Sequence, residues 1–134
     1  MRACQYGIAG RLRLNALPAA YPRLFPKGPL HWGFELGDGW SQVVALLCER
    51  LDTILQEAPG ASIEVLQVKE KFGGLRFYYS HHGVSDEMAT ALRDAVELAA
   101  TASLQICERC GRSGDVQDKA GWLRVVCSVC RIDP

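Results

Sequence analysis

The chain has 134 residues, of which 49% are hydrophobic, and its 15 basic and 15 acidic side chains give a formal net charge of zero. This length fits one domain with a buried core, and the neutral charge excludes the globally basic footprint of many nucleic-acid-binding domains. The sequence has neither an apolar run of bilayer length nor a signal peptide's apolar stretch. We therefore expect a protein of the reducing cytoplasm that does not associate with membranes.

Residues 1–39 show no sustained periodicity and are rich in proline and glycine. We predict an irregular N-terminal arm, with at most one short helical or strand piece around Gly7–Leu14. The aromatic side chains of this arm indicate that it packs on the body, because disordered segments are poor in aromatics. Residues 1–34 carry basic but no acidic side chains, and residues 35–68 are mainly acidic. The simplest interpretation is that the first segment docks on the second.

Residues 40–106 are predicted to form a helix–hairpin–helix core. Apolar residues at three- and four-residue spacing predict a helix from Trp40 that ends before Pro59, capped by Asp38 or Ser41. The β-branched segment 61–69 predicts a strand, and the next strand runs over residues 75–80 after a turn at Gly73-Gly74. A second long helix follows, capped by Ser85 or Asp86.

The hairpin register expected from a Gly73-Gly74 turn places Phe72 opposite Leu75 and separates two faces. The face expected to join the core carries Leu66, Val68, Phe72, Leu75, Phe77 and Tyr79. The opposite face carries Lys69, Lys71, Arg76 and Tyr78, with Gln67 and Ser80. Glu70 falls on the apolar face, which leaves three interpretations open. Its carboxylate caps hairpin amides, it pairs with an arginine, or the true register is slipped.

Neighbouring cations on one sheet face repel each other by a few tenths of a kcal/mol per pair. An anionic surface relieves that repulsion, and it can belong to a nucleic-acid backbone, an acidic partner protein or an acidic part of this chain. The alternative is an ordinary solvated face whose lysines discourage edge-to-edge pairing.

Residues 107–134 are predicted to form a zinc-ribbon module. Two Cys-x-x-Cys motifs supply Cys107, Cys110, Cys127 and Cys130, a spacing typical of one tetrahedral zinc site. The intervening residues suffice for a hairpin that turns at 118–121. Four thiolates leave no open coordination position, which favours one structural zinc over a catalytic one. The alternative is two disulfides, and Cys48 is expected to be an unreactive buried thiol.

Other candidate chemistry is sparse. His81 and His82, with Asp86 and Glu87 nearby, allow the alternative of a small hydrolase. The segment Gly37-Asp38-Gly39-Trp40 predicts a turn into the first helix and is not a phosphate loop, since no Gly-Lys-Ser/Thr follows it.

Two stretches carry a resemblance to a known group of proteins. They are His31-Trp32-Gly33-Phe34-Glu35 with Gly37-Asp38-Gly39-Trp40, and Val68-Lys69-Glu70-Lys71-Phe72-Gly73-Gly74-Leu75-Arg76-Phe77-Tyr78. With Trp122 before the second cysteine pair, residues 31–130 resemble small uncharacterised bacterial and phage proteins that end in a Cys4 zinc module. The resemblance implies a phage or prophage setting and a host-directed binding protein, for example a defence-system inhibitor.

Together the patterns predict one α+β domain: two helices packed on a β-hairpin, a C-terminal zinc ribbon and an irregular N-terminal arm. The predicted function is a non-enzymatic binding module that contacts a protein partner through Lys69, Lys71, Arg76 and Tyr78. The alternative is a nucleic-acid-binding zinc-ribbon protein, such as a small regulator or a nuclease accessory.

Overall fold

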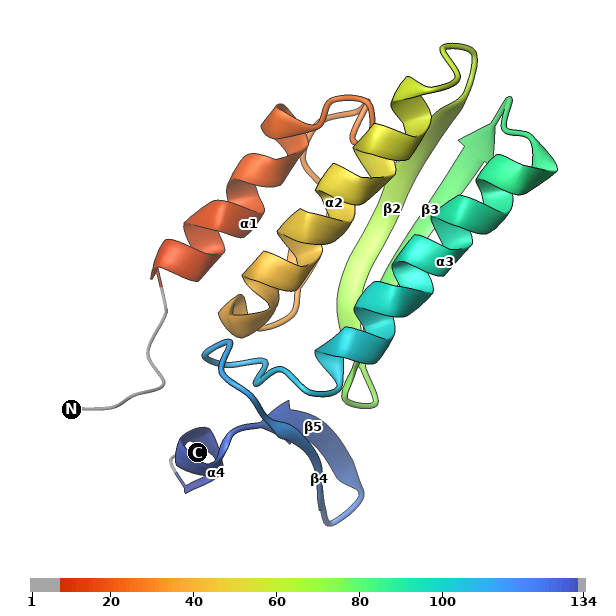
Figure 1. Ribbon diagram of the computed structural model, residues 1–134. Coiled ribbons are helices and arrows are strands. Elements are labelled where there is room, and N and C mark those ends of the chain that lie inside the picture. The colour runs from red at the N-terminus through yellow and green to blue at the C-terminus, as the bar shows by residue number, and fades with distance from the viewer. Residues whose placement is uncertain (1–7, 133–134) are drawn as a thin grey trace.

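The computed structural model describes residues 8–132, which form a mixed α+β fold with four α-helices and two small sheets (Figure 1). The elements in chain order are α1 (Ile8–Ala20), β1 (Phe34–Glu35), the 3₁₀ helix η1 (Asp38–Trp40), α2 (Ser41–Gln56), β2 (Ser62–Lys71), β3 (Gly74–His82), α3 (Asp86–Ser103), β4 (Asp115–Lys119), β5 (Trp122–Val126) and α4 (Ser128–Ile132). None of the described helices is long and apolar enough to cross a membrane.

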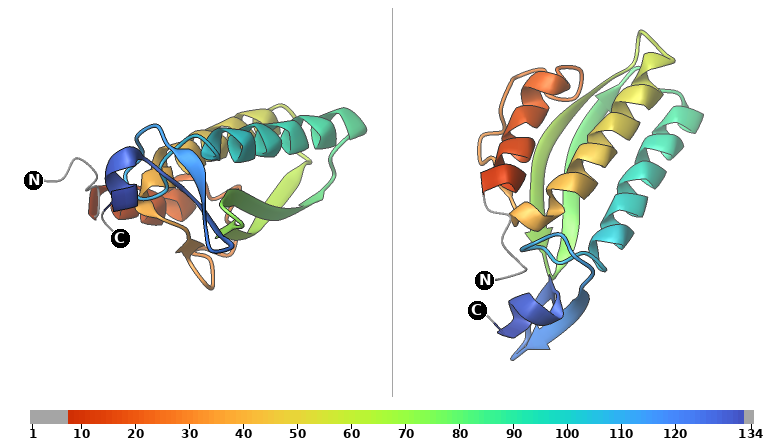
Figure 2. Two further views of the ribbon diagram at one scale, coloured as in Figure 1. Left: turned by 90° about the horizontal axis from the view of Figure 1, so that it is seen from below. Right: turned by 60° about the vertical axis from the view of Figure 1, so that its left-hand side comes forward.

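The helices α1, α2 and α3 lie side by side on one face of the β2–β3 hairpin (Figures 1 and 2). The core between the layers includes Val44 and Leu51 of α2, Val68 of β2 and Leu92 of α3, all of which are fully buried. The prediction of two helices on the hairpin therefore missed a third helix, α1. No described helix covers the opposite face of the hairpin, which stays open.

The one helical or strand piece allowed around Gly7–Leu14 is the helix α1, which runs further than predicted, to Ala20. The prediction of an otherwise irregular arm over residues 1–39 missed the short strand β1, and residues 1–7 lie outside the described part of the chain. Leu14 and Leu17 are buried against α2, but this stripe is short and Pro18 lies inside the helix. Packing therefore stabilises a helix whose sequence signal is weak, as is common for short helices. Of the arm's aromatics, Phe25 is buried but Trp32 is exposed.

The expected docking of the basic N-terminal segment on the acidic segment is confirmed by three ion pairs. They are Arg11 Nε to Asp38 Oδ1 at 2.7 Å, Arg23 Nε to Asp52 Oδ1 at 3.4 Å, and Lys27 Nζ to Glu64 Oε2 at 3.3 Å. The charges of Arg11, Arg23 and Lys27 are thus neutralised by acidic side chains within the fold.

The β2–β3 hairpin turns one residue earlier than predicted. Lys71 pairs with Gly74, and the two turn residues Phe72 and Gly73 have φ values of 55° and 83°. Positive φ at both positions is the type I′ geometry that matches strand twist. Glu70 supports this turn, because its carboxylate accepts a 2.8 Å hydrogen bond from the Gly73 amide. The capping role considered for Glu70 is confirmed.

A register shift between Val65 and Gln67 marks a β-bulge at Leu66. The extra residue turns Val65 and Val68 towards the core and leaves Leu66 52% exposed. Placing Leu66 and Phe72 on the core face is therefore wrong: the bulge rotates the first outwards, and the turn holds the second, which is 68% exposed.

The C-terminal hairpin forms as predicted, with its turn within residues 118–121. β4 and β5 pair antiparallel around Ala120 and Gly121, which have φ values of 56° and 86°. Asp118 Oδ1 accepts a 2.8 Å hydrogen bond from the Gly121 amide and fixes the turn. The predicted cap of the second long helix is also confirmed, since Ser85 Oγ accepts from the Met88 amide at 3.1 Å.

Candidate metal centre

The fold brings the four C-terminal cysteines into one buried cluster. Cys107 and Cys110 lie in the turn that follows α3, Cys127 follows β5, and Cys130 lies in α4. Their sulfur atoms all lie within 4.8 Å of one another. The predicted site residues are therefore assembled, and they can hold a metal ion.

The donor set fits a thiophilic ion. Four sulfurs at about 2.3 Å from one zinc stand about 3.8 Å apart in a regular tetrahedron, and the sulfurs of Cys110 and Cys127 are separated by 3.8 Å. The Cys130 amide donates to Cys127 Sγ at 3.3 Å. Burial raises the pKa of Cys127, but hydrogen bonds from the Cys130 and Val129 amides outweigh that effect and lower the pKa below its ordinary value. The site therefore favours the thiolate that a metal requires.

The two cysteine turns differ in backbone conformation. Gly111 follows the first pair with a φ of 84°, a conformation that favours glycine. The second pair instead lies at the short helix α4 (Ser128–Ile132). All four sulfurs therefore gather at one site, and they do not form two separate pairs. Coordination of a metal by all four sulfurs requires the cysteines in their thiolate form.

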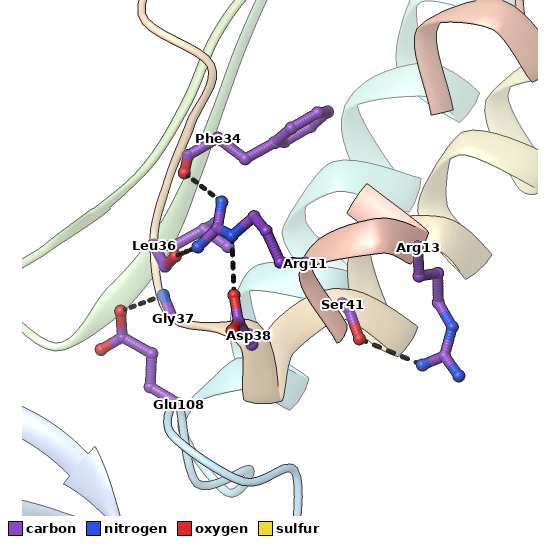
Figure 3. Close-up of polar contacts among 8 residues, drawn as sticks. All are labelled: Arg11, Arg13, Phe34, Leu36, Gly37, Asp38, Ser41 and Glu108. Carbon is purple, nitrogen blue, oxygen red and sulfur yellow. Dashed lines mark hydrogen bonds and ion pairs between the residues drawn. The ribbon is translucent and has the colours of Figure 1, made fainter. Parts of the chain in front are cut away.

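The cysteine cluster is fastened to the body through residues 37–40. The Gly39 amide donates to the Glu108 carbonyl at 2.7 Å, and Trp40 Nε1 donates to the Ile106 carbonyl at 2.8 Å. The Gly37 amide donates to Glu108 Oε2 at 2.8 Å (Figure 3). Burial raises the pKa of the Glu108 carboxyl, although this amide contact opposes the shift. Residues 37–40 thus hold the first cysteine turn through three hydrogen bonds.

The glycines of this loop allow that close approach. A Cβ atom at Gly39 would lie 2.6 Å from the Cys110 nitrogen and 2.5 Å from the Gly111 nitrogen. One at Gly37 would collide with the Glu108 carbonyl. The sequence predicted only a turn here, and the signal for a docking site was the pair of glycines flanking Asp38.

Arg11 of α1 holds the same loop from the other side. Its guanidinium donates to Asp38 Oδ1 at 2.7 Å, to the Phe34 carbonyl at 2.9 Å and to the Leu36 carbonyl at 2.6 Å (Figure 3). Asp38 is therefore engaged by Arg11, and neither Asp38 nor Ser41 caps α2 with its side chain. Sequence reasoning missed Arg11 because nothing in its local pattern indicates three acceptors that lie more than twenty residues away.

The predicted partner residues share one face of the sheet. Lys69 pairs with Arg76 and Gln67 with Tyr78, so Lys69, Lys71, Arg76 and Tyr78 lie together on the side without helices. We call these four residues the basic hairpin face. Tyr78 is 42% exposed, with the Lys69 ammonium 6.0 Å from the centre of its ring.

The acidic segment of the chain does not cover this face. Glu35 of β1 is the register neighbour of Lys69, but its carboxylate accepts a 2.8 Å hydrogen bond from Gln67. Within residues 8–132, no ion pair engages Lys69, Lys71 or Arg76. The three cations are therefore available to another molecule.

The histidine pair does not form a cleft. His81 and His82 are both exposed and, as successive strand residues, they point to opposite faces of β3. Neither imidazole makes a hydrogen bond or an ion pair with any described residue. Cys48 is fully buried as expected, and burial raises its pKa to about 12.

Comparison of the chain with protein-family models, with curated proteins and with solved structures gave no match.

Proposed function

We propose that this protein is a non-enzymatic binding module that contacts a partner protein through the basic hairpin face. One observation carries the proposal: Lys69, Lys71 and Arg76 lie on an open sheet face without an ion pair among the described residues. Arg11, Arg23 and Lys27 of the N-terminal segment, in contrast, are paired with Asp38, Asp52 and Glu64. Because Lys69, Lys71 and Arg76 have no ion pair among the described residues, an acidic surface of another molecule would complement their charge.

Side chains around the cations supply apolar contact area. Tyr78 is 42% exposed in the middle of the basic hairpin face, and Leu66 is 52% exposed beside the bulge. Tyrosine is enriched among the residues that dominate binding energy at protein interfaces. An acidic partner that covers Tyr78 would gain both charge complementarity and apolar burial.

The proposed role of the cysteine cluster is structural. A single zinc held by Cys107, Cys110, Cys127 and Cys130 would have no open position for substrate, so it would stabilise the module and its attachment to residues 37–40. This role would require reduced thiols, which the reducing cytoplasm maintains. The resemblance to small bacterial and phage proteins implies a host protein as the partner, for example a component of a defence system.

Nucleic-acid binding is the second candidate, and the position of Tyr78 among three cations favours it. An aromatic ring between cations is the arrangement on which single-stranded bases stack. The neutral net charge of the chain argues against it, because phosphate contacts supply most of the affinity in such complexes.

The test uses charge reversal on the open face with a matched reversal on the helical layer. Lys71→Glu/Arg76→Glu leaves Lys69 in place, which avoids setting a new carboxylate beside Glu35, and Arg50→Glu on α2 is the control. From an extract of the native host, wild type and Arg50→Glu should capture the same protein and the double variant should lose it. Equal capture by all three would refute the proposal. Salt-dependent binding of single-stranded DNA or RNA, lost only in the double variant, would establish the alternative.

A further inference from the structure

The strand β3 is an open edge of the main sheet. The strand order is β1–β2–β3, and no strand among residues 8–132 pairs with the outer side of β3. The strand has neither proline nor lysine, and the bulge lies on β2, so its only protections are Arg76 and the contact of its first residues with α3.

Two hydrogen bonds reveal which backbone groups face outwards. The Leu75 amide donates to Ser103 Oγ at 3.1 Å, so it points away from β2. The Val65 amide donates to the Leu24 carbonyl at 2.9 Å, so the groups of its partner Tyr79 also point away from β2. Backbone groups in an antiparallel pair alternate in direction, and those of His81 therefore face outwards as well.

The accessible part of this edge lies towards the end of β3. Phe77 is buried, whereas Tyr79 is half-buried and His81 is exposed. No hydrogen bond from the described part of the chain engages the backbone amides of Tyr79 and His81. Together they offer two donors and two acceptors to an added strand.

Cations flank this edge on both layers. Arg76 lies on the open face of β3, and Arg93 lies on α3, close enough to Tyr79 that its charge lowers the pKa of the phenol while burial raises that pKa more. Neither guanidinium has a hydrogen bond or an ion pair with another described residue. β3 itself contains no acidic side chain.

We propose that the partner contributes an extended acidic segment that adds to the β3 edge as a further strand, through backbone hydrogen bonds to Tyr79 and His81. Carboxylates on alternate residues of that segment face Arg76 on the open side of the sheet, and its other side chains lie beneath α3. This mode of recognition is β-strand addition, in which main-chain bonds give affinity and alternate side chains give specificity. The inference rests on the proposed function, because Arg76 belongs to the basic hairpin face.

A second copy of the chain fits this edge less well. Antiparallel pairing of two β3 strands about a twofold axis near Tyr79 would bring the two Arg93 side chains together and place Arg76 beside His82 of the other copy. The two Arg93 guanidinium charges would repel each other. The positive charges of Arg76 and Arg93 therefore favour an acidic strand from another molecule over a second copy of this chain.

The experiment uses the full-length protein and a capped (Glu-Val)4 peptide, with a (Lys-Val)4 peptide as the charge control. Binding is followed by calorimetry and by hydrogen exchange of the β3 amides. The acidic peptide should bind and protect Tyr79 and His81, and the basic peptide should not bind. Two further peptides are N-methylated on every Val or on every Glu. Amides of alternate residues face opposite edges of a strand, so one methylated peptide should lose binding and the other should keep it.

Variants of His81 test the edge from the protein's side. His81→Pro removes the outward amide without removing a bond to β2, and His81→Ala keeps that amide but loses the imidazole. The loss of one hydrogen bond should weaken binding about fivefold in His81→Pro and leave the affinity of His81→Ala close to that of wild type. Thermal unfolding of both variants checks that the fold is intact.

The outcomes separate this inference from the proposed function. No binding of (Glu-Val)4, or equal binding by His81→Pro and both methylated peptides, would overturn strand addition. If Lys71→Glu/Arg76→Glu still lost the native partner, the proposed binding face would stand. Protection of Tyr79 and His81 that rises with protein concentration without peptide would assign the edge to a second copy and overturn the inference.

Discussion

Replacing Gly39 by alanine tests the attachment of the cysteine cluster to the body. The new methyl group would lie 2.5 Å from the Gly111 nitrogen and 2.6 Å from the Cys110 nitrogen, both of which belong to backbone that cannot rotate away. The first cysteine turn must therefore shift. Overpacking of this kind costs about 1–3 kcal/mol, and weakening two hydrogen bonds adds about 1 kcal/mol each. Those bonds are Gly39 to Glu108 and Trp40 to Ile106.

We expect Gly39→Ala to lower the free energy of unfolding by about 3–5 kcal/mol. Urea unfolding followed by tryptophan fluorescence measures this loss, because Trp40 is fully buried at the contact. The same variant should release its metal to a chelator faster than wild type. Gly60→Ala is the matched control, since its Cβ would meet no atom within 4 Å. Equal stability and equal metal release in the two variants would refute the docking argument.

Further predictions address α1, the bulge and the buried thiol. Arg11→Lys keeps the charge but loses the fork that bonds three oxygens, and urea unfolding should show a loss of about 1–2 kcal/mol; an unchanged midpoint would contradict this. Leu66→Ser should change stability by less than about 0.5 kcal/mol and Val65→Ala should cost about 1–3 kcal/mol, whereas the reverse order would argue against the bulge. The pKa of Cys48 is about 12 in the folded state against an ordinary 9.0. Its contribution to stability is therefore complete below pH 9 and falls as the pH rises towards 12, a fall that Cys48→Ala should lack in pH-dependent unfolding. Native Cys48 should also resist alkylation at pH 8 until the protein unfolds.

The two-faced hairpin shows why part of the fold was predictable. The observed turn uses Phe72 and Gly73 instead of the two glycines, so every cross-strand partner differs from the predicted one. Moving a two-residue turn by one position shifts each partner between the turn and the bulge by two residues, which preserves the faces of the side chains in that part of the hairpin. Lys69, Lys71, Arg76 and Tyr78 therefore share a face in both registers.

Other features depend on contacts that no local pattern contains. The bulge at Leu66 inverts the alternation of the first half of β2, and its benefit is the burial of Val65 and Ile63 under the helices. The helix α1 gains its stability from burying Leu14 and Leu17 against α2. Arg11 bonds a loop that only the folded chain brings near. Each outcome is decided by tertiary packing rather than by propensity.

The candidate metal site was the most predictable part, because its spacing directly encodes its geometry. Two Cys-x-x-Cys pairs separated by a hairpin place four sulfurs within 4.8 Å of one another. What the spacing did not contain was the contact with Gly37, Gly39 and Trp40, since that interface joins segments about seventy residues apart.

Native mass spectrometry, which measures metal content and thiol state together, is the decisive test of the proposed structural zinc. The protein should carry one zinc per chain with the thiols of Cys107, Cys110, Cys127 and Cys130 reduced. Removal of the zinc by a chelator should unfold at least the C-terminal module. A metal-free protein that keeps its fold after purification under reducing conditions with zinc present would contradict the account.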